Sequence, residues 1–135
     1  MPSQIKHVVM AEDDNDDIEL FKTALNEECP DLELSVAEDG AKLIKLLGYI
    51  STPDVILLDL NMPCKDGKEC LVEIRGKKEY DEVPIVILST SSNKKDIEFC
   101  LSNGANHYFI KPNSYREVSS LVKNICDGDL QSNIA

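Results

Sequence analysis

The chain has few of the residues that build disulfide frameworks, zinc sites or membrane spans. Its five cysteines are an odd number without a Cys-x-x-Cys pair, and its two histidines, His7 and His107, lie far apart in the sequence. We therefore expect neither a disulfide framework nor a zinc site. No apolar run approaches the roughly 18 residues of a membrane helix, and the N-terminal segment lacks the apolar region of a signal peptide. Free thiols without a targeting signal indicate a cytoplasmic protein with no membrane partner.

Positive charge is also scarce. Fourteen lysines and arginines stand against 25 acidic residues, which gives a formal net charge of −11. Such a surface repels nucleic acids and anionic lipids unless its cations cluster on one face. The lysines form only short pairs, at 77–78 and 94–95. We therefore expect no nucleic-acid partner, and we expect most acidic residues, taken one at a time, to lie on a solvated surface.

Length and composition indicate a single folded domain. A chain of 135 residues can bury one sizeable core but is short for two ordinary domains. Its 42% hydrophobic and 29% charged residues are typical of a globular protein and not of a disordered chain. We assign residues 1–126 to the domain and residues 127–135 to a C-terminal tail.

Short apolar runs alternate with amphipathic segments along this domain. The runs predict five strands, at residues 7–11, 34–37, 55–58, 85–88 and 108–110. Two of them, 55–58 and 85–88, are continuously apolar, as is typical of inner strands in a parallel sheet that helices cover on both faces. Each intervening segment carries apolar residues at helical spacing, and the last helix begins at Ser114, with Glu117 in position for a capping box.

This alternation predicts an α/β fold. Five βα units with short right-handed crossovers give a doubly wound, five-stranded parallel sheet of the flavodoxin-like type, with strand order 2-1-3-4-5. In this architecture, ligands bind at the carboxyl ends of the strands.

Polar residues follow four of the predicted strands. Glu12 and Asp13 follow the first strand, Asp59 the third, Ser89 the fourth and Lys111 the fifth. Because parallel strands end at the same edge, we expect these side chains to share one crevice. Carboxylates brought together there either take up protons or bind a cation, and hard oxygen ligands suit Mg²⁺.

This group of residues has the requirements of phosphoryl transfer. A magnesium ion would neutralise some phosphoryl oxygens, while Lys111 and the Ser89 hydroxyl hold the others. Asp59 follows the most central strand and is the candidate nucleophile. Each residue alone also has a simpler interpretation, because a strand-end aspartate more often caps a helix and a lysine more often lies on the surface.

Two neighbouring sets of residues favour the simpler interpretation. Asp14, Asp16 and Asp17 are interpreted as solvated residues whose charge favours the dipole of the first helix. Tyr108 and Phe109, on the fifth predicted strand, are more often core residues than recognition residues.

Four segments resemble the receiver domains of two-component response regulators, which have the chemotaxis-protein-like fold. They are VVMAEDD at 8–14, VILLDLNMPCKDG at 55–67, PIVILSTSS at 84–92 and GANHYFIKP at 104–112. The resemblance covers residues 6 to about 125, and the length is similar to that of stand-alone, single-domain members. It implies that Asp59 is the phosphoryl acceptor. It also implies that Asp13, Asp59 and the backbone carbonyl of Asn61 bind Mg²⁺ directly, with Glu12 acting through water.

The resemblance also implies a switch. Ser89 matches the hydroxyl that turns toward the phosphoryl group, Lys111 matches the lysine that contacts it, and Tyr108 matches the switch aromatic. The Lys111–Pro112 peptide is expected to be cis, as in most members. Glu12 stands where many members have aspartate, and Ser89 where threonine is more common.

The implied partners are a sensor histidine kinase or a histidine phosphotransfer protein, and a downstream protein target that the sequence does not identify. The chain is then not an enzyme with a separate substrate, since it catalyses only its own phosphorylation and dephosphorylation. Two other hypotheses stay open. A phosphatase of the haloacid dehalogenase type needs a second acid where Asn61 stands, and a pseudo-receiver would bind partners without magnesium or phosphate.

Overall fold

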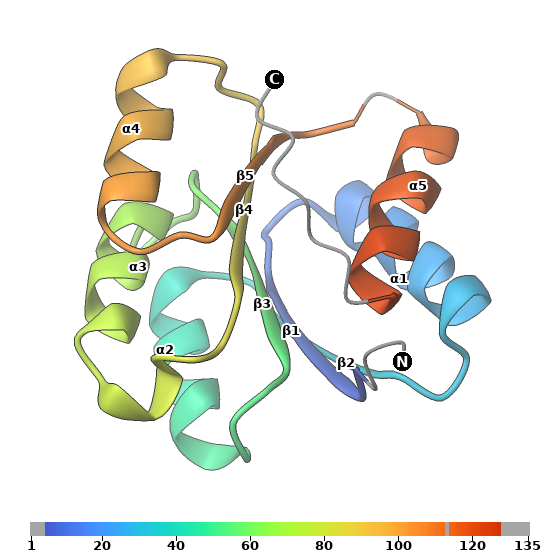
Figure 1. The fold of residues 1–135 in the computed structure, drawn as a ribbon, viewed down its shortest axis with the longest axis horizontal. Coiled ribbons are helices and arrows are strands. Elements are labelled where there is room, and N and C mark those ends of the chain that lie inside the picture. The colour runs from blue at the N-terminus through green and yellow to red at the C-terminus, as the bar shows by residue number, and fades with distance from the viewer. Residues whose placement is uncertain (1–4, 113, 128–135) are drawn as a thin grey trace.

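The computed structural model describes residues 5–112 and 114–127 as one doubly wound α/β fold (Figure 1). Its elements are β1 (His7–Ala11), α1 (Asn15–Glu28), β2 (Glu33–Ala37), α2 (Gly40–Tyr49), β3 (Val55–Asp59), α3 (Gly67–Arg75), the 3-10 helix η1 (Lys78–Tyr80), β4 (Ile85–Ser89), α4 (Lys94–Ser102), β5 (His107–Ile110) and α5 (Tyr115–Cys126). Of the predicted C-terminal tail, residues 127–135, the part from residue 128 onward lies outside the described residues. The domain boundary at residue 126 therefore stays a prediction.

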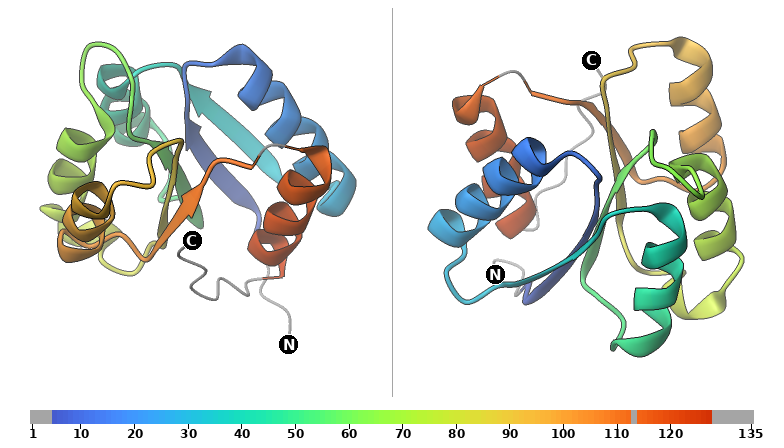
Figure 2. Two further views of the ribbon diagram at one scale, coloured as in Figure 1. Left: turned by 90° about the horizontal axis from the view of Figure 1, so that it is seen from above. Right: turned by 180° about the vertical axis from the view of Figure 1, so that it is seen from behind.

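The five strands form one parallel sheet in the order β2-β1-β3-β4-β5, which confirms the predicted fold class and strand order. Helices α1 and α5 cover one face of the sheet, and α2, α3 and α4 cover the other (Figures 1 and 2). Strand β3 lies at the centre and β4 beside it, as their continuously apolar sequences predict. The residues of both strands are buried because helices lie above and below them.

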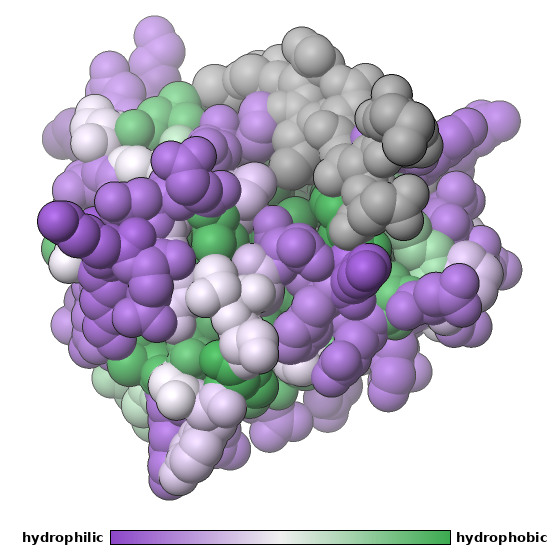
Figure 3. Space-filling model, turned by 60° about the horizontal axis from the view of Figure 1, so that its bottom comes forward, coloured by the Kyte–Doolittle hydropathy of each residue, from purple (hydrophilic) through white to green (hydrophobic). Residues whose placement is uncertain are grey.

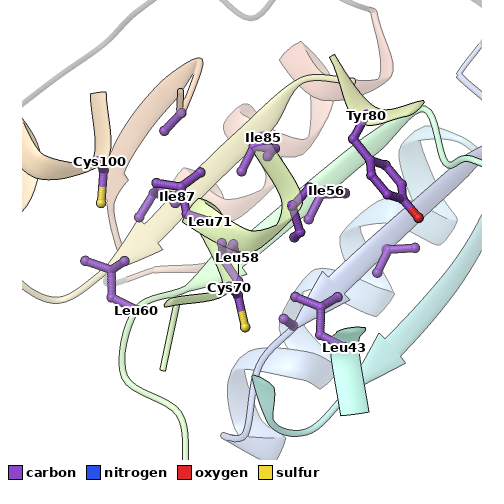
Figure 4. Close-up of a cluster of buried hydrophobic side chains, with 14 of the residues drawn as sticks. Leu43, Ile56, Leu58, Leu60, Cys70, Leu71, Tyr80, Ile85, Ile87 and Cys100 are labelled. Carbon is purple, nitrogen blue, oxygen red and sulfur yellow. The ribbon is translucent and has the colours of Figure 1, made fainter. Parts of the chain in front are cut away.

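Each face of the sheet has its own hydrophobic cluster, and β3 contributes to both. Ile56 and Leu58 point into the cluster under α2, α3 and α4, where Leu71 of α3 packs (Figure 4). Leu57 points into the cluster under α1 and α5. All four of these side chains are fully buried, and burial of one such side chain contributes about 1.5–3 kcal/mol. Asp59 therefore stands at the end of a strand that is buried on both faces.

Several acidic residues begin helices. The carboxylates of Asp14, Asp39 and Asp66 accept hydrogen bonds from backbone N–H groups at the starts of α1, α2 and α3. Ser114 caps α5 as predicted, because its Oγ accepts from the backbone N–H of Glu117. The surface seen from below in Figure 3 is mostly hydrophilic, with small hydrophobic areas between. Much of the acidity therefore has the solvated or capping role that composition predicts.

The expectation that every cysteine is free is wrong for one pair. Cys29, directly after α1, and Cys126, at the end of α5, form a disulfide, whereas Cys64, Cys70 and Cys100 are free. Helices α1 and α5 pack side by side and bring the two Cα atoms to 6.2 Å, within the range that a disulfide spans. The two residues are 97 positions apart in sequence, so spacing alone did not reveal them. Across 5–112 and 114–127, none of the helices combines the length and hydropathy that a bilayer span demands.

Candidate functional site

The predicted site residues lie at the carboxyl edge of the sheet. Glu12 directly follows β1, and its backbone N–H donates to the carbonyl of Ala37 at the end of β2. Asp59 and Ser89 are the last residues of β3 and β4, one position further into the sheet than the sequence predicts. Asp59 is paired with Leu88 in the strand register, so Ser89 extends one residue beyond it. The ladder of β-sheet hydrogen bonds therefore fixes the backbone under the site.

Three carboxylates converge at this edge, as predicted. One oxygen from each of Glu12, Asp13 and Asp59 lies within 4.8 Å of the others. Glu12 and Asp59 are only 1% and 4% exposed, whereas Asp13 is exposed. Burial raises the pKa of Glu12 to about 7 and also raises the pKa of Asp59, although Lys111 opposes both shifts. The site therefore favours either a proton or a cation over bare carboxylates.

Lys111 supplies the positive charge of the site. Its Nζ lies 2.9 Å from Glu12 Oε1 and 3.7 Å from Asp59 Oδ1. Burial works to lower the pKa of Lys111, but the hydrogen bonds to Glu12 and Asp17 and the charge of Asp59 outweigh it and raise the pKa. Lys111 is therefore a protonated ammonium that is 14% exposed. The surface interpretation of this lysine is wrong.

Asp17 is the site residue that sequence reasoning missed. Its position near the start of α1 predicts a solvated charge, but its Oδ2 lies 2.9 Å from Lys111 Nζ and its side chain is 28% exposed. Asp14 behaves as predicted, because it caps α1 by accepting from the backbone N–H groups of Asp16 and Asp17. The contact of Asp17 depends on how α1 is rotated against the end of β5. A sequence pattern within α1 carries no signal for it.

A network of hydrogen bonds holds the loop after β4. The hydroxyl of Tyr108, which is fully buried, donates to the carbonyl of Ser91 at 2.8 Å. The backbone N–H of Ser91 donates to Ser89 Oγ at 3.1 Å, and Ser91 Oγ donates to Asp96 at 2.6 Å. Lys68 of α3 also donates to Asp96, at 2.6 Å. Tyr108 is therefore a core residue, as its place on the fifth strand favours, and its hydroxyl also contacts the loop that follows Ser89.

The loop from β3 to α3 passes close behind Asp59. A Cβ atom on Gly67 would lie 2.2 Å from the carbonyl oxygen of Asp59, so no larger residue fits there without a shift of backbone. The backbone N–H of Asn61 donates to Asp59 Oδ1 at 3.4 Å. This close approach makes Gly67 part of the support of the site.

The expectation of a cis peptide at Lys111–Pro112 is wrong. The described residues contain no cis peptide bond, so this bond is trans. The trans form is the more stable one for a prolyl peptide by about 0.5–1 kcal/mol.

The donor set fits a small divalent cation. Oxygens on opposite sides of an octahedral Mg²⁺ ion lie about 4.2 Å apart, since each bond is about 2.1 Å. The oxygens of Asp13 and Asp59 lie within 4.8 Å of each other, close to this span, and a Glu12 oxygen lies within 4.8 Å of both, near enough to act through a bound water. Carboxylate oxygens are the ligands that such a hard cation prefers, and the exposure of Asp13 leaves room for water.

Comparison with known proteins agrees with this geometry. Residues 8–123 match the family described as the response regulator receiver domain. The chain is 32% identical over 126 residues to the response regulator Rcp1 of Synechocystis sp., covering 89% of this chain and 86% of that protein. It is also 32% identical over 118 residues to the sensor histidine kinase TmoS of Ectopseudomonas mendocina, of which the match spans 12%.

Solved structures give the same result. The phosphorylated cyanobacterial phytochrome response regulator RcpA has a TM-score of 0.86 and 34% sequence identity, with 94% of this chain and 95% of that chain covered. The Mn²⁺-bound form of Rcp1 has a TM-score of 0.80 and 31% identity, with 89% and 91% covered. Sequence, topology and the acidic edge of the sheet together lead to one assignment: the chain belongs to the receiver domain family of response regulators, which act in two-component signalling.

Proposed function

We propose that Asp59 accepts a phosphoryl group from a phosphohistidine and that this modification changes which protein the domain binds. The donor is a sensor histidine kinase or a histidine phosphotransfer protein, and the receiver of the signal is a downstream protein target. The observation that carries the proposal is the buried Asp59 with Lys111 Nζ at 3.7 Å and two further carboxylates beside it. We also propose that the protein works in the cytoplasm, where such kinases present their phosphohistidine.

The chemistry is a displacement at phosphorus. An Oδ atom of Asp59 forms a bond to the phosphorus, and the P–N bond to the donor histidine breaks. The electron pair of that bond stays on the imidazole nitrogen, which takes up a proton from solvent. Water later attacks the phosphorus, the P–O bond breaks, and Asp59 returns to a carboxylate with release of inorganic phosphate.

Each neighbouring residue has a proposed role in this displacement. Asp13, Asp59 and the backbone carbonyl of Asn61 would hold Mg²⁺ directly, and Glu12 would act through a bound water. The cation would neutralise negative charge on the phosphoryl oxygens. Lys111 is already protonated and 3.7 Å from Asp59, so it can donate to a phosphoryl oxygen without a large movement. The domain therefore supports the modification of its own Asp59 and is not an enzyme with a separate substrate.

Ser89 and Tyr108 are the proposed switch. Ser89 Oγ accepts from the backbone N–H of Ser91, whose carbonyl accepts from Tyr108. A phosphoryl group on Asp59 offers new acceptors to the Ser89 hydroxyl, and a movement of Ser89 would be passed through Ser91 to Tyr108. The affected surface is formed by α4, β5 and α5, where we place the binding of the downstream target.

Incubation with acetyl phosphate and Mg²⁺, followed by intact-protein mass spectrometry, tests the proposal. We expect a gain of one phosphoryl group that EDTA prevents and that Asp59→Asn abolishes. Asp54→Asn is a matched control, because Asp54 lies at the opposite end of β3 and bonds to the backbone of Lys6 and His7. Labelling of Asp59→Asn at the wild-type rate would remove Asp59 as the acceptor.

The two other hypotheses predict different results. A haloacid dehalogenase type phosphatase would release phosphate from a phosphomonoester over many turnovers, although Asn61 occupies the place of its second acid. A pseudo-receiver would give no Mg²⁺-dependent shift in the NMR signals of Asp13 and Asn61.

A further inference from the structure

The ammonium group of Lys111 is held from two sides. Glu12 Oε1 lies 2.9 Å from Nζ on the β1 side, and Asp17 Oδ2 lies 2.9 Å from Nζ on the α1 side. An ammonium group has three N–H donors. Glu12 Oε2 also lies within hydrogen-bond distance of Nζ, at 3.1 Å, so the ammonium is bound by these two carboxylates. Asp59 Oδ1 is 3.7 Å away, beyond hydrogen-bond distance.

Asp17 differs from the other carboxylates around this lysine. Glu12 and Asp59 belong to the three-carboxylate cluster that fits a cation, whereas Asp17 lies outside that cluster. When a cation and a phosphoryl group occupy the site, the charges of Glu12 and Asp59 are shared with them. Among the described partners of Lys111, Asp17 is the one whose charge is not shared with a cation or a phosphoryl group during the reaction.

We propose that Asp17 is a positioning residue that holds the Lys111 ammonium against the place of the phosphoryl group on Asp59. This inference rests on the proposed function, in which Lys111 donates to a phosphoryl oxygen. A lysine side chain has four rotatable bonds and is flexible unless its charged end is held. Fixing that end before the reaction removes the need to order it during phosphoryl transfer, which is how positioned groups lower a barrier.

Asp16 offers a matched control in the same turn of α1. It carries the same charge, it is exposed, and within the described residues its carboxylate has no hydrogen-bond or ion-pair partner. A general effect of negative charge on an anionic phosphodonor would appear equally in Asp16→Asn and Asp17→Asn. A positioning effect would appear only in Asp17→Asn.

The first experiment uses the resting protein and needs no phosphorylation. The side-chain ¹⁵N and ammonium proton signals of Lys111 are recorded by NMR in wild type, Asp16→Asn and Asp17→Asn. We expect an exchange-protected Lys111 signal in wild type and in Asp16→Asn, and a signal lost to exchange in Asp17→Asn. Equal protection in all three proteins would overturn the inference, whatever the outcome for Asp59.

The second experiment measures the rate of Asp59 phosphorylation by acetyl phosphate at saturating Mg²⁺. We expect Asp17→Asn to be about 10-fold slower than wild type, the lower end of the range for groups that orient a functional residue. Asp17→Glu should recover part of the rate, and Mg²⁺ affinity should change no more than in Asp16→Asn. In a Lys111→Gln background, Asp17→Asn should cause no further loss, since Asp17 acts through Lys111.

Equal rates in Asp16→Asn and Asp17→Asn, or a further loss in the Lys111→Gln background, would refute the positioning role. These outcomes differ from failure of the proposed function. That failure would appear as wild-type protein that gains no phosphoryl group at all.

Discussion

The buried Glu12 makes the stability of this domain depend on pH. Burial raises the pKa of Glu12 from an ordinary 4.5 to about 7, although the hydrogen bond with Lys111 opposes the rise. A carboxyl group whose pKa is higher in the folded than in the unfolded protein binds more protons when folded. The stabilisation from this group is therefore complete below about pH 4.5, and it is lost as the pH rises through about 7.

The size of the effect follows from the shift. Between about pH 5 and 7 the folded protein holds about one more proton at Glu12, so the free energy of unfolding falls by up to about 1.4 kcal/mol per pH unit. From pH 5 to pH 8 this amounts to roughly 2–3 kcal/mol. Glu12→Gln removes the titration and keeps the shape of the side chain. Burial also raises the pKa of Asp59, although the charge of Lys111 opposes this rise. Asp59 titrates in wild type and in Glu12→Gln alike.

Urea unfolding followed by circular dichroism measures the difference. We expect the free energy of unfolding in EDTA to fall more steeply with pH in wild type than in Glu12→Gln. The difference between the two proteins from pH 5 to pH 8 should be roughly 2–3 kcal/mol. Saturating Mg²⁺ should flatten the wild-type curve, because a bound cation favours the ionised carboxylate. Parallel curves for the two proteins would refute the raised pKa of Glu12.

Three further predictions concern the support of the site and of the fold. Gly67→Ala should destabilise the fold by about 1–3 kcal/mol and slow phosphorylation, because the new Cβ would lie 2.2 Å from the carbonyl of Asp59. Gly48→Ala, which has open space around it within α2, should instead stabilise by up to about 1 kcal/mol, and guanidinium midpoints compare the two. Reduction of the Cys29–Cys126 disulfide, which closes 97 positions of chain, should lower the free energy of unfolding by up to about 4–5 kcal/mol; an equal midpoint with and without reductant would contradict this. Lys68→Ala should lower the free energy of unfolding by no more than about 1 kcal/mol, since its ion pair with Asp96 is partly exposed. It should nevertheless speed amide hydrogen exchange in residues 89–93. Unchanged exchange there would show that the ion pair does not hold the loop.

The fold and most of the site could be predicted because their signals are local. The runs at 55–58 and 85–88 are apolar at every position, which is typical of strands covered on both faces. These runs and the helices between them predict a parallel sheet, and in a parallel sheet the polar residues that follow each strand meet at one edge. Glu12, Asp13, Asp59 and Lys111 could therefore be grouped before any distance was known.

Contacts between layers could not be predicted in the same way. The pairing of Lys68 with Asp96, 28 positions apart, depends on how α3 and α4 lie against each other, and the Gly67 contact depends on the path of a loop. The peptide bond before Pro112 is trans. A prolyl peptide favours trans over cis by only about 0.5–1 kcal/mol, so contacts with the surrounding structure decide which form is present.

By itself, the sequence determined the parallel sheet, its strand order and the acidic crevice around Asp59, because hydrophobic periodicity and strand direction are properties of short segments. Only the tertiary structure decided that Asp17 turns from solvent to Lys111 and that Cys29 meets Cys126. Both contacts depend on the rotation of α1 about its axis and on its packing against the end of β5 and against α5. Periodicity identifies the face of a helix that is buried, but the side chain that meets a given partner is set by the packing of whole elements.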